Sequence, residues 1–187
     1  ERSAIGLRLR KRSVLPATRA FREGWIEVQD EGSQLVAQLV GAQPGELGID
    51  FCAGAGGKTL ALAAAMENRG RILAWDVAAS RFDQMKPRLV RAGVDNVQRR
   101  LLASENDPFI EQFRDMADWV LVDAPCTGTG LWRRSPDLRR RTSPTDLDEA
   151  LDQQNCILAS AAKLVKPGGR LVYATCSILP RENETQV

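Results

Sequence analysis

The stretch LGIDFCAGAGGKTLALAAAM, residues 47–66, decides the fold. A short apolar strand at 47–51 runs into a loop rich in glycine, and a helix rich in alanine and leucine follows at 59–66. Glycines between a strand and a helix let a ligand approach the backbone closely, and the first turn of the helix offers unpaired N–H groups. The stretch therefore predicts a strand–loop–helix unit with a ligand-binding loop.

Strands and helices alternate on both sides of this unit. The further predicted strands are 71–75, 97–102, 119–122 and 170–174, and the further helices are 33–40, 80–92 and 147–165. Pro87 is expected to kink the second of these helices, and the KPGG sequence at 166–169 is expected to end the third. Apolar runs without alternation, separated by helices, are typical of parallel strands covered on both faces. We expect an α/β fold with a mostly parallel twisted sheet and helices on both faces.

The length of 187 residues suits one domain with a small extension. Residues 1–24 are predicted to be a basic N-terminal extension or linker. Residues 25–187 are predicted to form the domain, truncated at its C-terminus because 184–187 resemble the start of a helix. There is no signal-peptide pattern and no apolar run near the ~20 residues that a membrane span needs, so the cytoplasm is the expected location. Oligomeric state is not readable, and a monomer is the default.

Two segments concentrate basic residues. Residues 1–22 carry seven Lys or Arg, including Arg2 and Arg12, against one acidic residue, Glu1. The second segment, 133–141, carries five arginines against Asp137. Basic segments suit a polyanion such as RNA, and the alternative is a solvated surface. The residues predicted to hold RNA phosphates are Arg133, Arg134, Arg139, Arg140 and Arg141.

The chain has four cysteines and no histidine. No two cysteines have C-x-x-C spacing, so neither a structural metal site nor a disulfide framework is expected. Cys156 lies in a predicted helix and is expected to be inert. Cys126 and Cys176 each follow a short apolar run, which suggests covalent chemistry by sulfur.

Polar or reactive residues follow four of the predicted strands. In an open α/β sheet, ligands bind beyond the carboxyl ends of the strands. Asp76, which ends the second strand, is placed to bind both hydroxyls of a ribose, although a helix cap is the alternative. An adenosine-containing cofactor follows, either a dinucleotide or S-adenosylmethionine. The loop is no phosphate-binding P-loop, because Cys52 stands where that motif needs glycine.

Six motifs together resemble the Sun family of RNA cytosine-5 methyltransferases. They are QDEGSQ at 29–34, DFCAGAGGKT at 50–59, DAPCTGTG at 123–130, RRSPD at 133–137, KPGG at 166–169, and YATCS at 173–177 with ENE at 182–184. The resemblance covers about residues 25–187. It implies a Rossmann-like class I methyltransferase domain that uses S-adenosylmethionine and acts on RNA. Ribosomal RNA is the expected substrate, and transfer RNA is the alternative.

The resemblance also implies roles for particular residues. Cys176 is the implied nucleophile, and Cys126 assists product release. The implied cofactor residues are Cys52, Ala53, Gly54, Ala55, Gly56, Gly57, Lys58, Asp76 and Asp123. The chain departs from the family pattern at Ala55, where proline is frequent, and after the third strand, where the family usually has Asp. Ser104 is the best positional match there, with Glu105 or Asn106 as substitutes.

The chemistry of cytosine methylation suits these residue types. A thiolate that adds to carbon 6 makes carbon 5 nucleophilic. Lys58 is the candidate cation that lowers the pKa of Cys176. Asp123 is placed to hold the edge of the base, and Cys126 is the candidate to serve as, or to position, the base that removes the proton from carbon 5.

Three alternatives accompany this interpretation. Pro125-Cys126 resembles the Pro-Cys nucleophile of DNA cytosine-5 methyltransferases, and chemistry alone does not rank the two thiols; the Thr-Cys-Ser motif favours Cys176. A non-catalytic RNA-binding module could keep the same fold. An NAD-dependent oxidoreductase is disfavoured because Thr59 stands where G-x-G-x-x-G needs glycine.

Overall fold

The computed structural model describes residues 3–11, 13–141 and 143–187. Arg2 and Arg12, counted above as basic, lie outside the described residues. Five strands form one sheet in the order β3-β2-β1-β4-β5, and every neighbouring pair is parallel. The strands are β1 Leu47–Asp50, β2 Arg71–Asp76, β3 Val97–Leu101, β4 Ala117–Asp123 and β5 Val165–Ala174. The predicted parallel α/β fold is confirmed.

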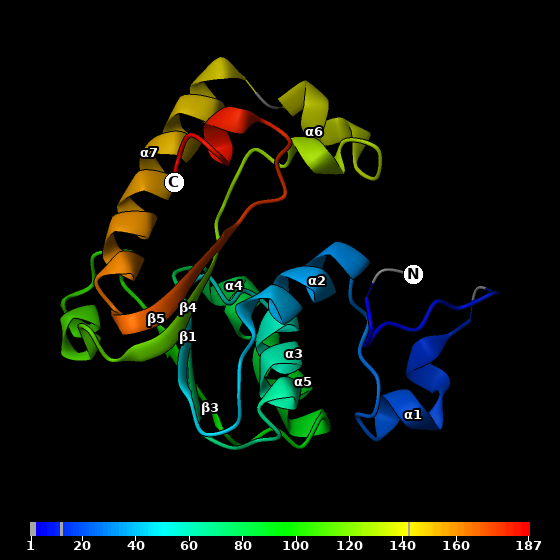
Figure 1. The fold of residues 1–187 in the computed structure, drawn as a ribbon. Coiled ribbons are helices and arrows are strands. Elements are labelled where there is room, and N and C mark those ends of the chain that lie inside the picture. The colour runs from blue at the N-terminus through cyan, green and yellow to red at the C-terminus, as the bar shows by residue number, and fades with distance from the viewer. Residues whose placement is uncertain (1–2, 12, 142) are drawn as a thin grey trace.

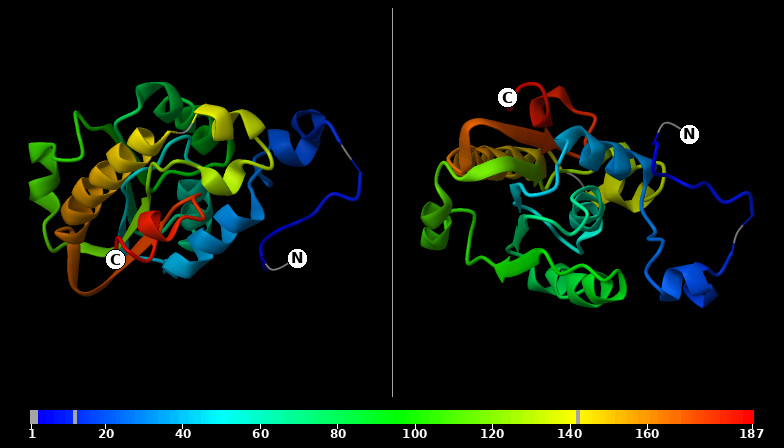
Figure 2. Two further views of the ribbon diagram at one scale, coloured as in Figure 1. Left: turned by 90° about the horizontal axis from the view of Figure 1, so that it is seen from above. Right: turned by 60° about the horizontal axis from the view of Figure 1, so that its bottom comes forward.

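Helices cover both faces of the sheet (Figures 1 and 2). The α-helices are α1 Arg19–Arg22, α2 Glu31–Val40, α3 Gly57–Ala65, α4 Ala79–Phe82, α5 Met85–Arg91, α6 Pro136–Arg141 and α7 Pro144–Ala162. Short 3-10 helices lie at Leu15–Ala17, Pro108–Phe113, Thr129–Leu131 and Pro180–Glu182. Alternate side chains of each inner strand face opposite layers, because successive strand residues point to opposite sides.

The core accordingly has two sides. Trp119 and Leu121 of β4 pack with residues of α2 and α3, whereas Val120 and Val122 pack with α7. All four side chains are fully buried. Burial on both faces explains why β4 appears in the sequence as an uninterrupted apolar run.

Gly48 of β1 is required by the packing of this core. It lies opposite Trp119 in the β1–β4 register, and a Cβ atom at position 48 would stand 1.9 Å from the indole ring. The ring is fully buried and cannot move aside without disturbing α2 and α3.

We therefore expect Gly48→Ala to lower the free energy of unfolding by about 1–3 kcal/mol, as overpacked cores do. Urea unfolding measures the change. Gly32→Ala in α2 is the matched control, because its Cβ would come no closer than 3.4 Å to the Asp30 carboxylate. Equal midpoints for the two variants would contradict the prediction.

Two element boundaries differ from the sequence prediction. The helix expected at 80–92 is split into α4 and α5, and Pro87 does not kink it. Pro87 is instead the third residue of α5, in the first turn, where a missing N–H costs no hydrogen bond.

The helix expected at 147–165 runs from Pro144 to Ala162, because Ser143 and Asp146 form a capping box at its start. The KPGG sequence lies inside β5 and does not end the helix. Val165 already pairs with Ala117, and the β4–β5 register then shifts before Arg170 pairs with Trp119. A strand with such an irregularity lacks the uninterrupted apolar pattern by which its start could be recognised.

The N-terminal segment lies against the helical layer beside α5 (Figure 1). The Arg91 guanidinium donates a hydrogen bond to the Phe21 carbonyl at 2.9 Å and lies 3.8 Å from the centre of the Phe21 ring. Glu27 bridges Arg88 and Arg91 by ion pairs. The end of the predicted extension at 1–24 therefore makes specific contacts with α5.

Candidate active site

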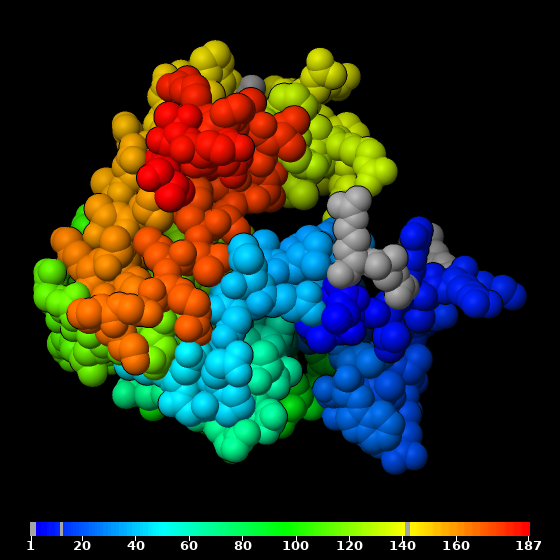
Figure 3. All heavy atoms as spheres, viewed as in Figure 1, coloured from blue at the N-terminus to red at the C-terminus, as the bar shows by residue number. Residues whose placement is uncertain are grey.

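A cavity of about 1090 Å³ opens at the carboxyl ends of β1, β2, β4 and β5. Figure 3 shows the surface hollowed between α2 and the segment around α6. Asp50, Asp76 and Asp123 end their strands in this cavity, and Cys126 and Cys176 follow β4 and β5. The strand order reverses between β1 and β4, which is where open α/β sheets bind ligands.

Most of the predicted cofactor residues line this cavity. They are Cys52, Ala53, Gly54, Ala55, Gly57, Lys58, Asp76 and Asp123. Gly56 does not line it. The backbone of Gly56 has a φ of +81°, and a Cβ there would stand 2.5 Å from the Met85 side chain. This glycine therefore serves the turn into α3 and its packing on α5.

Ser104 is a second correction, because it is not among the lining residues. Its hydroxyl accepts a hydrogen bond from the Asn106 N–H at 3.2 Å. Glu105, the substitute next to it, does line the cavity. The direction of the loop after β3 decides which of the two adjacent polar residues, Ser104 or Glu105, faces the cavity. The sequence pattern does not specify that direction.

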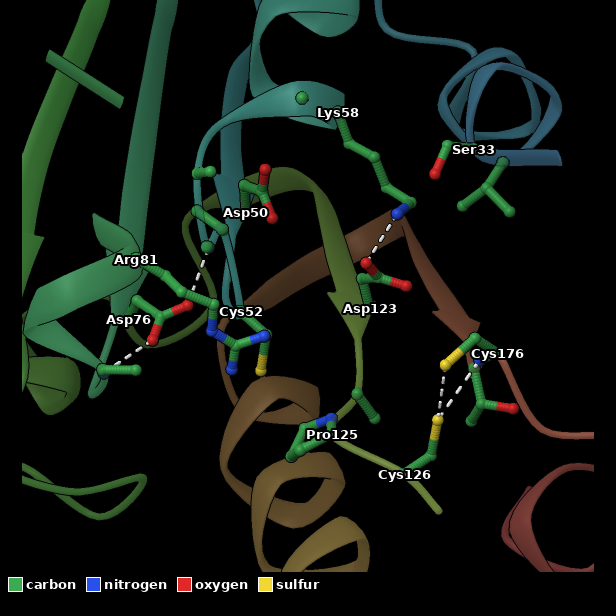
Figure 4. Close-up of a pocket in the computed structure, with 18 of the residues that line it drawn as sticks. Ser33, Asp50, Cys52, Lys58, Asp76, Arg81, Asp123, Pro125, Cys126 and Cys176 are labelled. Carbon is green, nitrogen blue, oxygen red and sulfur yellow. Dashed lines mark hydrogen bonds and ion pairs between the residues drawn. The ribbon is translucent and has the colours of Figure 1, made fainter. Parts of the chain in front are cut away.

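The Asp76 carboxylate is nearly buried and braces the glycine loop. One oxygen accepts from the Gly54 N–H at 2.7 Å, and the other accepts from the Ala78 N–H at 2.7 Å (Figure 4). Each oxygen keeps a lone pair for a further donor. Asp76 can therefore order both loops and still accept ribose hydroxyls.

Asp50 was overlooked as a site residue in the sequence. Its Oδ2 accepts a hydrogen bond from the Thr59 hydroxyl at 2.7 Å, while its Oδ1 is buried without a partner among the described residues. Burial raises the pKa of Asp50 to about 7, even though Thr59 opposes the shift. A buried acceptor that lines a cavity suits a cationic ligand. Its place at the end of a strand was the available signal.

Lys58 and Asp123 form an ion pair across the cavity. The Lys58 ammonium lies 2.5 Å from the Asp123 carboxylate, and Lys58 is mostly buried (Figure 4). The sequence prediction that Lys58 lowers the pKa of Cys176 gains no support, because Lys58 is not among the leading causes of that shift, the first of which is the hydrogen bond from Cys126. The Lys58 ammonium pairs with the Asp123 carboxylate, so its positive charge stabilises the charge of Asp123.

The two thiols of the predicted mechanism meet. Their sulfurs lie 3.1 Å apart, and the Cys176 N–H also points at the Cys126 sulfur at 3.3 Å (Figure 4). The hydrogen bond from Cys126 lowers the pKa of the Cys176 thiol to about 7. The same contact, together with burial, raises the pKa of Cys126. When the pair holds a single proton, that proton stays on Cys126. The thiolate is then Cys176, the more exposed of the two cysteines.

This pairing predicts how the reactivity of Cys176 depends on pH. Only the thiolate reacts, so alkylation should be fast above about pH 7 and fall about tenfold per pH unit below it. The measurement is the rate of iodoacetamide modification of Cys176, followed by mass spectrometry of its peptide. In Cys126→Ala the profile should move to higher pH, because the donor is gone. An unchanged profile in that variant would contradict the assignment.

The predicted RNA-binding arginines are distributed over two environments. Arg133 and Arg134 line the cavity, and Arg134 pairs with Asp30 ahead of α2. Arg139 lies over the Trp132 ring at 5.8 Å, and Arg140 is exposed on α6. Arg141 ends that helix. The basic residues thus follow the rim of the cavity and the helix next to it.

Within residues 3–11, 13–141 and 143–187, no three acidic, cysteine or histidine side chains gather as metal ligands. The helices described in that part of the chain are too short or too polar to cross a bilayer.

The sheet order, the glycine loop, the acidic strand end and the shared cavity define a Rossmann-like class I methyltransferase domain. The chain belongs to the RsmB/F family of 16S rRNA methyltransferases, whose sequence model matches residues 37–187. Methyltransferases of this class depend on S-adenosylmethionine, as the sequence predicts. The resemblance to the Sun family is confirmed, with ribosomal RNA small-subunit methyltransferase B as the type it resembles.

Individual relatives support the same family assignment. The probable ribosomal RNA small subunit methyltransferase B of Synechocystis sp. is 38% identical over 186 residues, which cover 97% of this chain and 41% of that protein. NSun6 from Pyrococcus horikoshii, solved with SFG, is 30% identical with a TM-score of 0.81, covering 91% of this chain and 43% of that one. A methyltransferase homologue from the same organism is 34% identical with a TM-score of 0.80, covering 93% and 53%. The chain spans about two fifths of the length of its curated relatives.

Proposed function

We propose that this chain transfers a methyl group from S-adenosylmethionine to carbon 5 of a cytosine in RNA, through a covalent bond between Cys176 and carbon 6. The observation that carries the proposal is the thiol pair, 3.1 Å apart, in the cavity that also holds the glycine loop. Relatives named for ribosomal RNA support that substrate, with transfer RNA as the alternative. The cytoplasmic location stays a prediction.

The residues of the cavity fit the cofactor. Asp76 keeps acceptor capacity for ribose hydroxyls, and the unpartnered Oδ1 of Asp50 suits a cationic group. S-adenosylmethionine carries both a ribose and positive charge, and it supplies the methyl group when bound. Glu105, the residue next to the best positional match for the family's Asp, lines the same cavity.

The reaction divides between three side chains. Cys176 adds as a thiolate to carbon 6, which turns carbons 4 and 5 into an enamine that takes up the methyl group. Asp123, oriented by Lys58, accepts hydrogen bonds from the base edge while the ring gains electrons. Cys126 then removes the proton from carbon 5 or positions the base that does so. The bond from carbon 6 to sulfur breaks, the double bond returns, and the thiolate of Cys176 is restored.

This division predicts the phenotype of Cys126→Ala. Without a group for proton removal the adduct forms and stays, so protein should accumulate covalently on ordinary cytidine RNA. Release should slow by about 10²-fold or more, the usual scale of general base catalysis. Denaturing gel electrophoresis after mixing with RNA and S-adenosylmethionine measures it. Release at the wild-type rate would contradict the role of Cys126.

RNA containing 5-fluorocytidine tests the whole proposal, because fluorine blocks the loss of the carbon 5 substituent. Wild-type protein should remain attached to this RNA, and Cys176→Ser should not. Loss of the complex only in Cys126→Ser would reverse the two cysteine roles. No complex with wild type, with cofactor binding retained, would instead favour a non-catalytic RNA-binding module.

A further inference from the structure

A buried carboxylate outside the reacting groups links the two loops that carry the cysteines. Glu182 lies in the 3-10 helix after β5 and is fully buried. Its Oε1 accepts from the Thr127 N–H at 2.8 Å, and its Oε2 accepts from the Thr127 hydroxyl at 2.5 Å. Thr127 immediately follows Cys126. The carboxylate thus holds the residue next to one sulfur.

Gln154 of α7 extends this contact. Its side-chain amide donates to Glu182 at 3.0 Å and to the Pro125 carbonyl at 2.9 Å. Pro125 immediately precedes Cys126. The backbone on both sides of that cysteine is therefore tied to the same buried pair, and the loop has little freedom to move away.

The residue that follows Glu182 connects to the loop of Cys176. The Asn183 side chain accepts a hydrogen bond from the Thr175 hydroxyl at 2.7 Å and donates one to the Ser177 carbonyl at 3.1 Å. Burial alone would raise the pKa of Glu182, but the polar groups of Ser177, Thr127 and Gln154 around the carboxylate outweigh burial and lower it. Glu182 is therefore charged, and a charged group accepts stronger hydrogen bonds than a neutral one.

A buried charge is expensive, and this one touches neither the glycine loop nor the Lys58–Asp123 pair in any described contact. Its side-chain partners, Thr127 and Gln154, hold the backbone around Cys126, and the adjacent Asn183 holds the residues that flank Cys176. Stability alone gives no reason to prefer a carboxylate, since an apolar side chain would avoid the cost of burial. A rigid distance between two loops does give such a reason.

We infer that Glu182 is a positioning residue that fixes Cys126 against Cys176, and that its loss slows release of the methylated RNA more than formation of the adduct. The inference rests on the proposed function. A displacement near 1 Å at a catalytic group costs about 10²-fold in rate. Adduct formation needs Cys176 and Asp123, which β5 and β4 hold independently.

The experiment compares Glu182→Gln with Glu184→Gln. The second variant makes the same change at an exposed residue two positions away. Glu182→Gln removes the negative charge and one of the two acceptor oxygens, so the N–H and the hydroxyl of Thr127 can no longer both donate to a charged group. We expect Glu182→Gln to accumulate covalent protein on ordinary cytidine RNA, with release slowed about 10²-fold. Affinity for S-adenosylmethionine, measured by calorimetry, should stay within about twofold. Glu184→Gln should behave as wild type.

A milder pair protects the test against misfolding. Thr127→Val removes the hydroxyl but keeps the N–H and the shape, and should also accumulate the adduct. Thr127→Ser keeps the hydroxyl and should recover most of the release rate. A general structural role would instead lower cofactor affinity, adduct formation and thermal stability together, and that result would overturn the inference.

The Cys126→Ala variant distinguishes a failure of the role inferred for Glu182 from a failure of the role proposed for Cys126. If Cys126→Ala accumulates adduct and neither Glu182→Gln nor Thr127→Val does, the role of Glu182 is wrong while the proposed function stands. If Cys126→Ala releases RNA normally, the proposed role of Cys126 is wrong, and the inference drawn from it is overturned as well.

Discussion

Cys176→Ala is expected to lower methyl transfer by at least about 10³-fold, because the variant lacks the thiolate that is proposed to add to carbon 6. Single-turnover assays with labelled S-adenosylmethionine measure the loss. Cofactor affinity should stay near the wild-type value, since the Asp76 and glycine-loop contacts are untouched. The variant should also fail to form any covalent complex with RNA.

Cys156→Ala is the matched control, because Cys156 is an exposed thiol on α7. It should keep full activity. Activity that survives in Cys176→Ala but disappears in Cys126→Ala would assign the nucleophile to the Pro-Cys loop. That outcome would revive the resemblance to DNA cytosine-5 methyltransferases.

Asp123→Asn is expected to slow methyl transfer by about 10²–10³-fold, the cost of removing one oriented group that stabilises developing charge. Asparagine keeps the size of the side chain but loses the charge that pairs with Lys58. The rate of adduct formation should fall together with the rate of transfer, because Asp123 acts before the methyl group moves. Quenched-flow trapping on RNA measures both.

Asp152→Asn, an exposed change on α7, serves as the control for Asp123 and should leave the rates as they are. If Asp123→Asn forms adduct at the wild-type rate, another group holds the base. Unchanged RNA affinity with a reduced rate would favour a role in the transition state over one in binding.

Much of the fold could be predicted from local patterns. β1, β2 and β4 are short apolar runs, and parallel strands buried on both faces produce such runs. The element boundaries that were predicted wrongly depend on contacts with more distant parts of the chain. Pro87 fits a helix that starts two residues before it, and β5 starts at Val165 because Ala117 is available as its partner.

The site divides in the same way. Residues at strand ends were predictable, since parallel strands bring their carboxyl ends to one edge of the sheet. Contacts between side chains were not: Lys58 was expected near Cys176 and pairs with Asp123. Glu182 appeared only as part of a motif, because a carboxylate in a polar segment gives no sign of full burial.

The closeness of the two sulfurs has a cost outside the catalytic cycle. A disulfide bond is about 2 Å long, and these sulfurs already lie 3.1 Å apart. A mild oxidant that removes two electrons and two protons would join Cys126 to Cys176 and disable both groups at once, without unfolding the chain. A preparation could then be fully folded, bind cofactor and yet be inactive, and a reducing agent would restore it.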